Sequence, residues 1–326
     1  MTIVNSIETP WIRTHTCGEL KGESAGQEVV LAGWVSKRRD HGGLIFIDLR
    51  DRYGITQLVF DPAISGDTTS KEDAETIRSE FVISVRGTVR RRPDEMVNPK
   101  ISTGEIEISV TELNILSAAK TPPFVIDDNT DAGEALRLKY RYLDLRRGSI
   151  QRNLIVRHQT YQSIRQYLSG LNFLEIETPI LFKSTPEGAR DYLVPSRVNQ
   201  GSFYALVQSP QIMKQLLMVG GFDRYFQVAR CFRDEDLRAD RQPEFSQIDI
   251  EMSFTNREFI YQIMEGLVLN LFRDTKSMDI SAPFPRMTYQ QAMDEYGVDK
   301  PDTRFELKIK DASSVFKQTG FQAFRS

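Results

Sequence analysis

The sequence predicts a multidomain protein in which an N-terminal all-β barrel precedes an α+β domain built on an antiparallel sheet. In residues 15–116, short apolar runs are separated by turns rich in glycine and proline, a pattern typical of strands. Beyond residue 150, strand-like runs alternate with segments of helical spacing, which indicates a mixed domain. With 326 residues, 40% of them apolar, the chain is long enough for two or three domains with buried cores.

Five strands and one helix are expected in the N-terminal domain. The helix, at about residues 71–80, follows the third strand, which is the element order of the OB-fold, a barrel that often binds single-stranded nucleic acid. The pattern alone leaves another small β-barrel open. The expected strands span residues 29–35, 44–50, 55–60, 81–91 and 105–113.

The second half begins with a linker rich in Pro, Asp, Thr and Asn, from residue 118 to about 131. A helix at about 151–168, a strand at 203–208 and a further helix follow. We place the domain boundaries at 1–117 for the barrel, 118–150 for the linker or hinge, 151–284 for the α+β domain and 285–326 for a further segment.

The helix after residue 208 contains a lysine that packing does not require. Ser209 is a good N-cap, and Pro210 fits the first helical position. We expect a buried stripe of Ile212, Leu216 and Val219. Lys214 then lies near the helix N-terminus, where the helix dipole disfavours a cation but where exposed N–H groups and an ammonium together bind anions.

Residues 225–254 predict two strands joined by a long charged loop. The second strand directs apolar residues to one face. A ring, an amide and two carboxylates occupy the other face, opposite a strand end that bears Arg233 and Glu235. Because an arginine grips phosphates and carboxylates through two hydrogen bonds, this face suits a nucleotide plus an amino acid. The four residues of that face are Phe245, Gln247, Asp249 and Glu251.

Composition excludes several classes. Two distant cysteines argue against a disulfide framework and favour a reducing cytosol. Three scattered histidines make a histidine-based metal site improbable, and no metal ligand is predicted. No apolar run suggests a signal segment or a membrane span, so we expect a cytoplasmic protein. No glycine-rich strand-turn-helix supports a Rossmann or P-loop site.

Charge gives a weaker indication. The net charge of −3 does not by itself suggest nucleic acid. Three basic runs in the N-terminal half, at residues 37–39, 90–92 and 137–147, nevertheless favour a polyanion partner.

The run from Phe232 to Glu235, with its charged loop and return strand, resembles motif 2 of the class II aminoacyl-tRNA synthetases. The longer run FRDEDLRADRQPEF is similar to the bacterial-type aspartyl-tRNA synthetases. The resemblance implies that residues 151–284 are part of a class II catalytic domain with motifs 1 and 2, and that residues 285–326 begin the bacterial insertion domain.

The same resemblance implies roles for the strand-pair residues. Arg233 would hold the α-phosphate of ATP and the substrate carboxylate, and would be the catalytic residue through charge stabilisation. The implied ATP-binding residues are Arg233, Asp234, Glu235, Gln242 and Phe245, with Phe245 stacking on adenine.

Two further stretches resemble the family's amino-acid pocket. In the QSPQ-x-x-K run, Gln211 and Lys214 would contact the substrate, with Lys214 meeting the aspartate side chain. In the loop 185–192, Glu187 would help to bind the substrate ammonium. Asp249 and Arg233 complete the implied aspartate site, which should be one pocket shared by Arg233 and Lys214.

Motif 1 and the anticodon domain are implied as well. Residues 170–181 resemble motif 1, which forms the homodimer interface in the family, with Pro179 near the partner's active site. In the barrel, the implied anticodon-binding residues are Arg39, His41, Phe46 and Gln57. Some bacterial members with this histidine accept both tRNA(Asp) and tRNA(Asn).

The resemblance therefore implies an aspartate–tRNA ligase that uses L-aspartate, ATP as a substrate with Mg²⁺, and tRNA(Asp), with tRNA(Asn) as a further acceptor. Motif 3 is absent from these residues, so we expect the Mg²⁺ ligands to lie outside this chain and the chain alone to be inactive. The alternatives left open are a non-catalytic tRNA-binding fragment and an asparaginyl- or lysyl-type synthetase.

Overall fold

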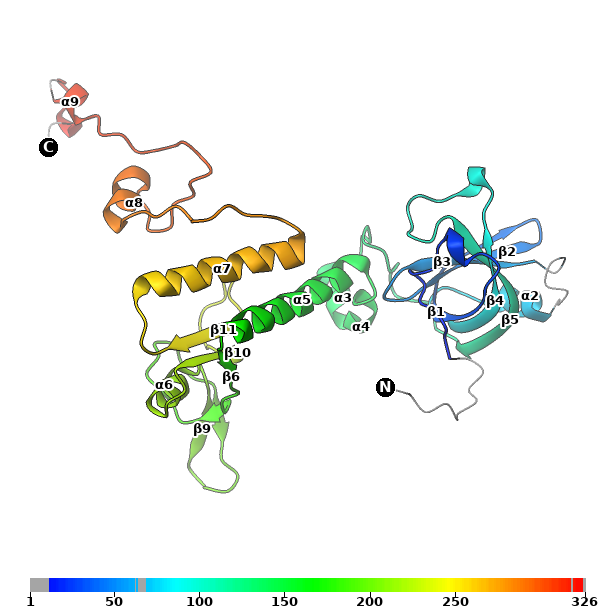
Figure 1. Ribbon diagram of the computed structural model, residues 1–326, viewed down its shortest axis with the longest axis horizontal. Coiled ribbons are helices and arrows are strands. Elements are labelled where there is room, and N and C mark those ends of the chain that lie inside the picture. The colour runs from blue at the N-terminus through cyan, green and yellow to red at the C-terminus, as the bar shows by residue number, and fades with distance from the viewer. Residues whose placement is uncertain (1–11, 62, 64–68, 318, 325–326) are drawn as a thin grey trace. The chain divides into compact units, whose positions relative to one another are not determined.

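The computed structural model describes residues 12–61, 63, 69–317 and 319–324 (Figure 1). The chain forms two compact units that divide between Val156 and Arg157. None of the helices in the described ranges is long and apolar enough to cross a bilayer. The predicted domain boundaries, which are finer than this division, remain predictions.

In the part of the first unit that the structure describes, five strands pair in the closed order β1-β2-β3-β5-β4, and β4 also pairs with β1 (Figure 1). The helix α2 (Thr69–Thr76) follows the third strand along the chain. The predicted order of strands and helix is confirmed. The strands are β1 (Glu28–His41), β2 (Leu44–Arg50), β3 (Ile55–Phe60), β4 (Val82–Arg91) and β5 (Ile106–Ser117).

Alternation along β2 shows why these residues form a closed sheet. Ile45, Ile47 and Leu49 are fully buried in the core of the unit, while the residues between them are partly exposed. Since neighbouring side chains on a strand point to opposite faces, β2 presents its intervening residues, Phe46 among them, on the outer surface. This outer face is where the predicted anticodon-binding residues lie.

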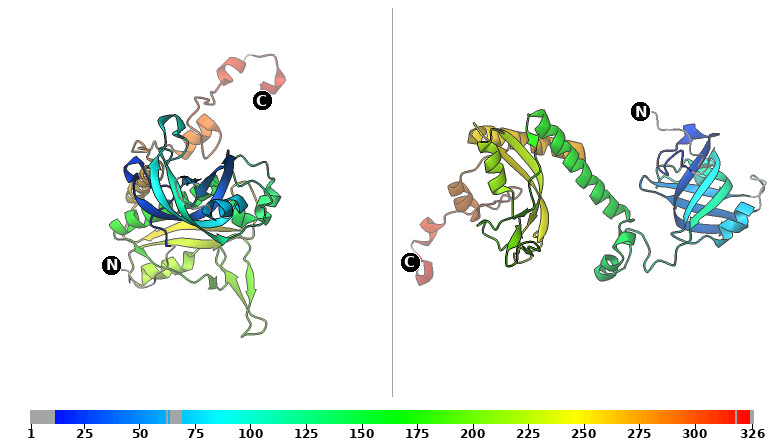
Figure 2. Two further views of the ribbon diagram at one scale, coloured as in Figure 1. Left: turned by 90° about the vertical axis from the view of Figure 1, so that its right-hand side faces the viewer. Right: turned by 90° about the horizontal axis from the view of Figure 1, so that it is seen from below.

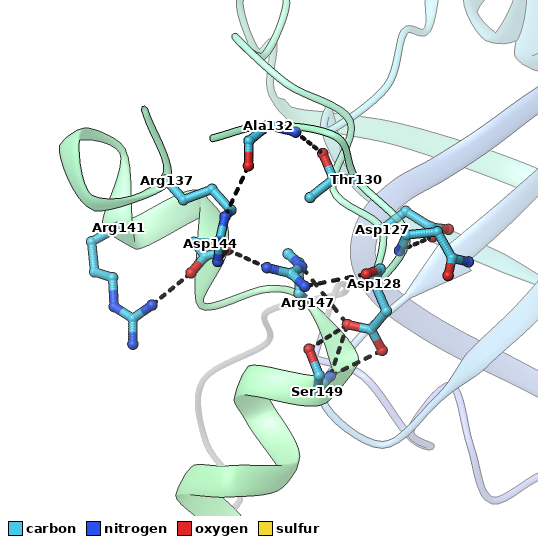
Figure 3. A network of polar contacts seen from close by, with 10 residues as sticks. Asp127, Asp128, Thr130, Ala132, Arg137, Arg141, Asp144, Arg147 and Ser149 are labelled. Atoms are coloured by element: carbon cyan, nitrogen blue, oxygen red, sulfur yellow. Dashed lines mark hydrogen bonds and ion pairs between the residues drawn. The ribbon is translucent and has the colours of Figure 1, made fainter. Parts of the chain in front are cut away.

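The segment predicted as a linker is held by ion pairs and hydrogen bonds (Figure 3). It contains two short helices, α3 (Glu134–Lys139) and α4 (Arg141–Asp144). The fully buried carboxylate of Asp144 accepts a hydrogen bond from Arg147 at 2.9 Å. Asp128 in turn accepts from the hydroxyl of Ser149 at 2.6 Å. These contacts give the second half of the linker a defined structure.

Two further arginines tie this segment to the closed sheet. The carboxylate of Glu80, which is 3% exposed, accepts from Arg50 at 2.8 Å and from Arg146 at 2.6 Å. The Arg146 guanidinium also lies 5.2 Å from the centre of the Trp34 ring. The start of α5 (Gly148–Gly170) therefore follows directly on residues that are anchored to the first unit.

The second unit is built on a sheet of order β11-β10-β6. The long strands β10 (Arg224–Phe232) and β11 (Glu244–Met252) are antiparallel, as predicted, and the two-residue strand β6 (Leu174–Glu175) runs parallel to β10. Helices α5 and α7 (Arg257–Lys276) pack on one face of this sheet (Figures 1 and 2). The buried residues of this core are Ile164, Leu168, Phe173, Phe226, Ile263 and Leu267.

The opposite face of the β10–β11 pair is covered in part by α6 (Gln211–Val219), which contacts both strands. A second small sheet, of order β7-β9-β8, precedes α6 along the chain. Its strands are β7 (Leu181–Phe182), β8 (Leu193–Pro195) and β9 (Phe203–Leu206). The remaining elements are η1 (Gly22–Ser24), η2 (Asp94–Met96), α8 (Tyr289–Tyr296), α9 (Ser313–Phe316) and η3 (Gln322–Phe324).

Candidate active site and nucleic-acid interface

The register of β10 and β11 places the polar residues of the two strands side by side. Asp249 pairs with Gln227, and Phe245 pairs with Cys231. Since paired residues share a face, these side chains form one floor on the side of the sheet away from α5 and α7. The floor consists of Tyr225, Gln227, Ala229 and Cys231 from β10 and Phe245, Gln247, Asp249 and Glu251 from β11.

At one end of this floor, a cavity of about 520 Å³ contains most of the predicted ATP-binding residues. The guanidinium carbon of Arg233 lies 5.1 Å from the centre of the Phe245 ring, a cation–π contact that fixes both groups. Four of the five predicted ATP-binding residues line the cavity: Arg233, Glu235, Gln242 and Phe245. Asp234, the fifth, instead donates its backbone N–H to the carbonyl of Arg190 at 3.1 Å.

Farther along the floor, the Lys214 ammonium is paired with two carboxylates. It lies 2.8 Å from Asp249 and 3.3 Å from Glu251. Burial alone would lower the pKa of Lys214, but the hydrogen bond to Asp249 and the two negative charges outweigh it and raise that pKa. The second carboxylate oxygen of Asp249, a residue only 5% exposed, has no hydrogen-bond partner among the described residues.

The predicted packing of α6 is wrong in two respects. Leu216 and Val219, expected to be buried, are 57% and 86% exposed. Lys214 points inward instead, because its two carboxylate partners on β11 compensate the cost of burying its charge. Ser209 is not the N-cap either: Pro210 occupies that position, and the Ser209 hydroxyl donates to Glu187 at 2.6 Å.

The structure brings some of the predicted aspartate-binding residues together, since Lys214 is paired with Asp249, but it does not bring all of them into one described cavity. Glu187 is held beside Ser209, the second residue before Gln211, which starts α6. The cavity that contains Arg233 does not include Lys214. Both residues nevertheless belong to elements on the same face of the β10–β11 pair, and the expectation of one shared pocket remains a prediction.

Pro179, the predicted dimer-interface residue, is exposed. The residue before it reaches the floor of the sheet, since the Thr178 hydroxyl donates to the side-chain oxygen of Gln227 at 2.9 Å. The same oxygen accepts from the Tyr225 hydroxyl at 2.8 Å. The loop of Pro179 is therefore fixed to the floor from one side.

In the first unit, a cavity of about 780 Å³ contains all four predicted anticodon-binding residues, Arg39, His41, Phe46 and Gln57. Arg39 donates to Asp48 at 2.6 Å and to Gln57 at 3.2 Å. The rings of His41 and Phe46 meet edge to face, with centroids 5.9 Å apart. Because adjacent strands β1, β2 and β3 carry these residues, sheet register alone brings them together.

Four charged residues of this cavity were not predicted as part of the site from the sequence: Arg90, Arg91, Arg92 and Glu107. The carboxylate of Glu107 accepts from Gln57 at 2.8 Å and from Arg90 at 2.7 Å. Arg92 is 8% exposed, and its Nη2 has no hydrogen-bond partner in the part of the chain that the structure describes. Burial lowers the Arg92 pKa, although the nearby Glu107 opposes this. In the sequence, residues 90–92 stand out only as a basic run, although residues two apart in an extended segment share a face. Arg90 and Arg92 both lie beside Glu107.

Comparison with known families agrees with this geometry. Residues 133–321 match the family model of the class II tRNA synthetases (D, K and N). Residues 29–116 match the model of the OB-fold nucleic acid binding domain. The chain therefore belongs to the class II tRNA synthetases, and the predicted fold class is confirmed.

Individual relatives show which members of the family this chain is similar to. The aspartate–tRNA(Asp/Asn) ligase of Oleidesulfovibrio alaskensis is 61% identical over 314 residues, which cover 96% of this chain and 52% of the relative. The ligase of the same name from Bacillus cereus strain AH187 is 60% identical, with 96% and 53% covered. The chain thus spans about half the length of these curated relatives. The resemblance to aspartyl-tRNA synthetases is confirmed.

A solved structure is similar as well. The asparaginyl-tRNA synthetase of Pyrococcus horikoshii, in complex with asparaginyl-adenylate, is 26% identical with a TM-score of 0.71. The similarity covers 81% of this chain and 58% of that protein.

Proposed function

We propose that this chain belongs to an enzyme that activates L-aspartate with ATP and transfers the aspartyl group to tRNA(Asp) and tRNA(Asn). The structural observation that supports aspartate is the Lys214 ammonium, held 2.8 Å from Asp249 on the face that also carries Phe245. The buried ammonium of Lys214 suits the side-chain carboxylate of aspartate, and the carboxylates next to it suit the substrate ammonium. The names of the relatives, aspartate–tRNA(Asp/Asn) ligases at 61% and 60% identity, support the same substrate.

The chemistry is an attack of the aspartate α-carboxylate on the α-phosphorus of ATP. A carboxylate oxygen–phosphorus bond forms, and the bond to the leaving pyrophosphate breaks. The attacking carboxylate is already ionised at neutral pH, so no general base is needed. Arg233 stabilises the charge that develops on the phosphate, and Phe245 holds the adenine, so catalysis consists of positioning and electrostatics.

In the amino-acid pocket, Lys214 meets the side-chain carboxylate of aspartate. Glu187 and the unpartnered oxygen of Asp249 receive the substrate ammonium. Gln211, at the start of α6, contacts the substrate from the helix N-terminus.

Class II synthetases use ATP together with Mg²⁺. Among the residues that the structure describes, no group of three or more histidine, cysteine, aspartate or glutamate side chains is arranged to hold a metal ion. Mg²⁺ bound together with ATP would neutralise part of the charge on the phosphates. The residues described above bind and orient the two substrates.

The OB-fold cavity is the proposed anticodon site. Phe46 provides a ring for stacking on a base, and Arg39 and Gln57 provide hydrogen bonds. His41 faces the third anticodon base and permits both tRNA(Asp) and tRNA(Asn). Aspartylation that is confined to tRNA(Asp) transcripts would reject this relaxed specificity. A homodimer formed around Pro179 and a cytoplasmic location complete the proposal.

The test is ATP–pyrophosphate exchange by the complete gene product with a panel of amino acids. Exchange that depends on aspartate, and not on asparagine or lysine, is expected. Exchange with asparagine would favour the second candidate, an asparaginyl-type enzyme, whose similarity in fold makes it the nearest rival. Binding of tRNA without any exchange would instead identify a non-catalytic tRNA-binding protein.

A further inference from the structure

Gln208 is buried beneath the loop 185–192, with only 1% of its surface exposed. Its side-chain oxygen accepts from the N–H of Ala189 at 3.1 Å, and its amide nitrogen donates to the Ala189 carbonyl at 2.9 Å. The amide nitrogen also donates to the carboxylate of Asp191. An amide offers a donor and an acceptor side by side, so Gln208 pairs with the Ala189 backbone as a neighbouring strand would.

The loop also contains contacts of its own: the Glu187 N–H donates to the Thr185 carbonyl at 2.9 Å, and the Thr185 hydroxyl donates to the Glu187 carboxylate at 3.1 Å. Gly188 has a positive φ of 102°, a conformation that glycine adopts without strain. At the far end, Asp191 also accepts from the Ser184 hydroxyl, which joins the exit of the loop to its entrance. Gln208 therefore fixes the loop at Ala189 and Asp191, and Asp191 in turn connects the end of the loop to Ser184 before its start.

Two consecutive residues hold the tip of this loop. Gln208 fixes Ala189, while Ser209 donates to the carboxylate of Glu187 at 2.6 Å. Between these two loop residues lies only Gly188. On the other side, the carbonyl of Arg190 accepts from the backbone N–H of Asp234, which connects the loop to the strand end next to Arg233.

We propose that Gln208 is a positioning residue for aspartate binding. Its buried amide fixes Ala189 and Asp191, and so holds the Glu187 carboxylate at the N-terminus of α6, where the substrate ammonium would bind. This inference rests on the proposed aspartate activation. Gln208 does not contact the substrate in this proposal but acts through the loop that carries Glu187.

The variant Gln208→Glu tests this role with almost no change in shape. A carboxylate can still accept from Ala189 N–H but cannot donate to its carbonyl, and it repels Asp191. In the complete gene product, we expect the KM for aspartate in pyrophosphate exchange to rise about tenfold. The KM for ATP should stay within about twofold, because the side-chain hydrogen bonds of Gln208 go to Ala189 and Asp191 and not to the ATP-binding residues. A fold-wide defect would change both constants.

The double variant Gln208→Glu, Asp191→Asn restores one contact with reversed polarity, since the new asparagine amide donates to the new carboxylate. We expect it to recover most of the lost aspartate affinity. It also serves as the test if the single variant does not fold. An aspartate KM in the single variant equal to that of the wild type, or a double variant no better than the single one, would overturn the inference.

Hydrogen exchange separates this inference from the proposed function. In the free protein, the amide of Ala189 should exchange at least tenfold faster in Gln208→Glu than in the wild type, because its loop loses an anchor. An unchanged exchange rate contradicts the positioning role. If the wild type shows no aspartate-dependent activity but the exchange rate changes as expected, the proposed function fails while the loop anchor stands.

Discussion

The OB-fold domain and the synthetase unit assemble their candidate sites in different ways. In the OB-fold domain, three adjacent strands of a closed sheet bring Arg39, Phe46 and Gln57 into one cavity. In the synthetase unit, a loop, a helix and a strand pair each contribute, and the cavity of Arg233 does not include Lys214. The first site depends on strand register, whereas the second depends on contacts such as those of Gln208 and Ser209 that orient a loop and a helix end.

This difference predicts that the two sites respond to substitution independently. Substitutions on the OB-fold sheet should change tRNA binding and leave amino-acid activation unchanged. Substitutions at the synthetase floor should do the opposite.

The largest effect is expected for Lys214→Met. Loss of the ammonium removes the partner of the substrate side chain and leaves Asp249 buried and unpaired, which costs about 3 kcal/mol. We expect kcat/KM for aspartate to fall about 100-fold or more in pyrophosphate exchange, and tRNA binding to stay unchanged. The matched control is Lys276→Met, an exposed lysine at the end of α7. A rate equal to that of the control would reject the role of Lys214.

Phe46→Ala tests the other region. Loss of a stacking ring costs about 1–3 kcal/mol per base, so the KM for tRNA should rise at least fivefold, while pyrophosphate exchange without tRNA stays at the wild-type rate. Tyr53→Ala is the control, since Tyr53 is 51% exposed on the same domain but does not line the cavity. If both variants weaken tRNA binding equally, the cavity is not the anticodon site.

A smaller effect is expected for Phe245→Ala. The ring lies beneath the Arg233 guanidinium, and stacking on adenine contributes about 1 kcal/mol. The KM for ATP should rise about fivefold, with the KM for aspartate nearly unchanged. Phe222→Ala, at a 43% exposed ring outside the cavity, provides the comparison. A rise in the aspartate KM alone would place the nucleotide elsewhere.

The smallest effect concerns the two buried thiols, one in each region. Burial raises the pKa of Cys231 to about 11, and it raises the pKa of Cys17 further. A raised thiol pKa stabilises the fold at pH values below the ordinary pKa of 9.0, and this stabilisation is lost as the pH rises toward 11. Because the thiolate is the form that reacts, alkylation by iodoacetamide, followed by mass spectrometry, should modify Cys231 before Cys17 as the pH is raised. The reverse order would show that the OB-fold core is the more accessible one.

The positions of the strands and the faces of their residues were predictable from sequence because side-chain alternation has a period of two, whereas the roles of Arg39, His41 and Gln57 were implied only by the resemblance to the synthetase family. The buried Ile45, Ile47 and Leu49 illustrate this alternation. The orientation of α6 was not predictable, because its apolar residues are numerous on several faces and the partners of Lys214 lie 35 and 37 residues away on β11. Gln208 belongs to the QSPQ run that resembles the family's pocket, but its own role was not predictable, since a buried amide that pairs with a loop backbone has no spacing of its own.

Binding of a non-hydrolysable sulfamoyl analogue of aspartyl-adenylate to the complete gene product tests the central claim, that one sheet face holds both substrates. We expect one analogue to bind per active site, with competition by ATP and by aspartate alike, and with weakened binding in both Lys214→Met and Phe245→Ala. Displacement of the analogue by only one of the two substrates, or weakening in only one of the two variants, would contradict it.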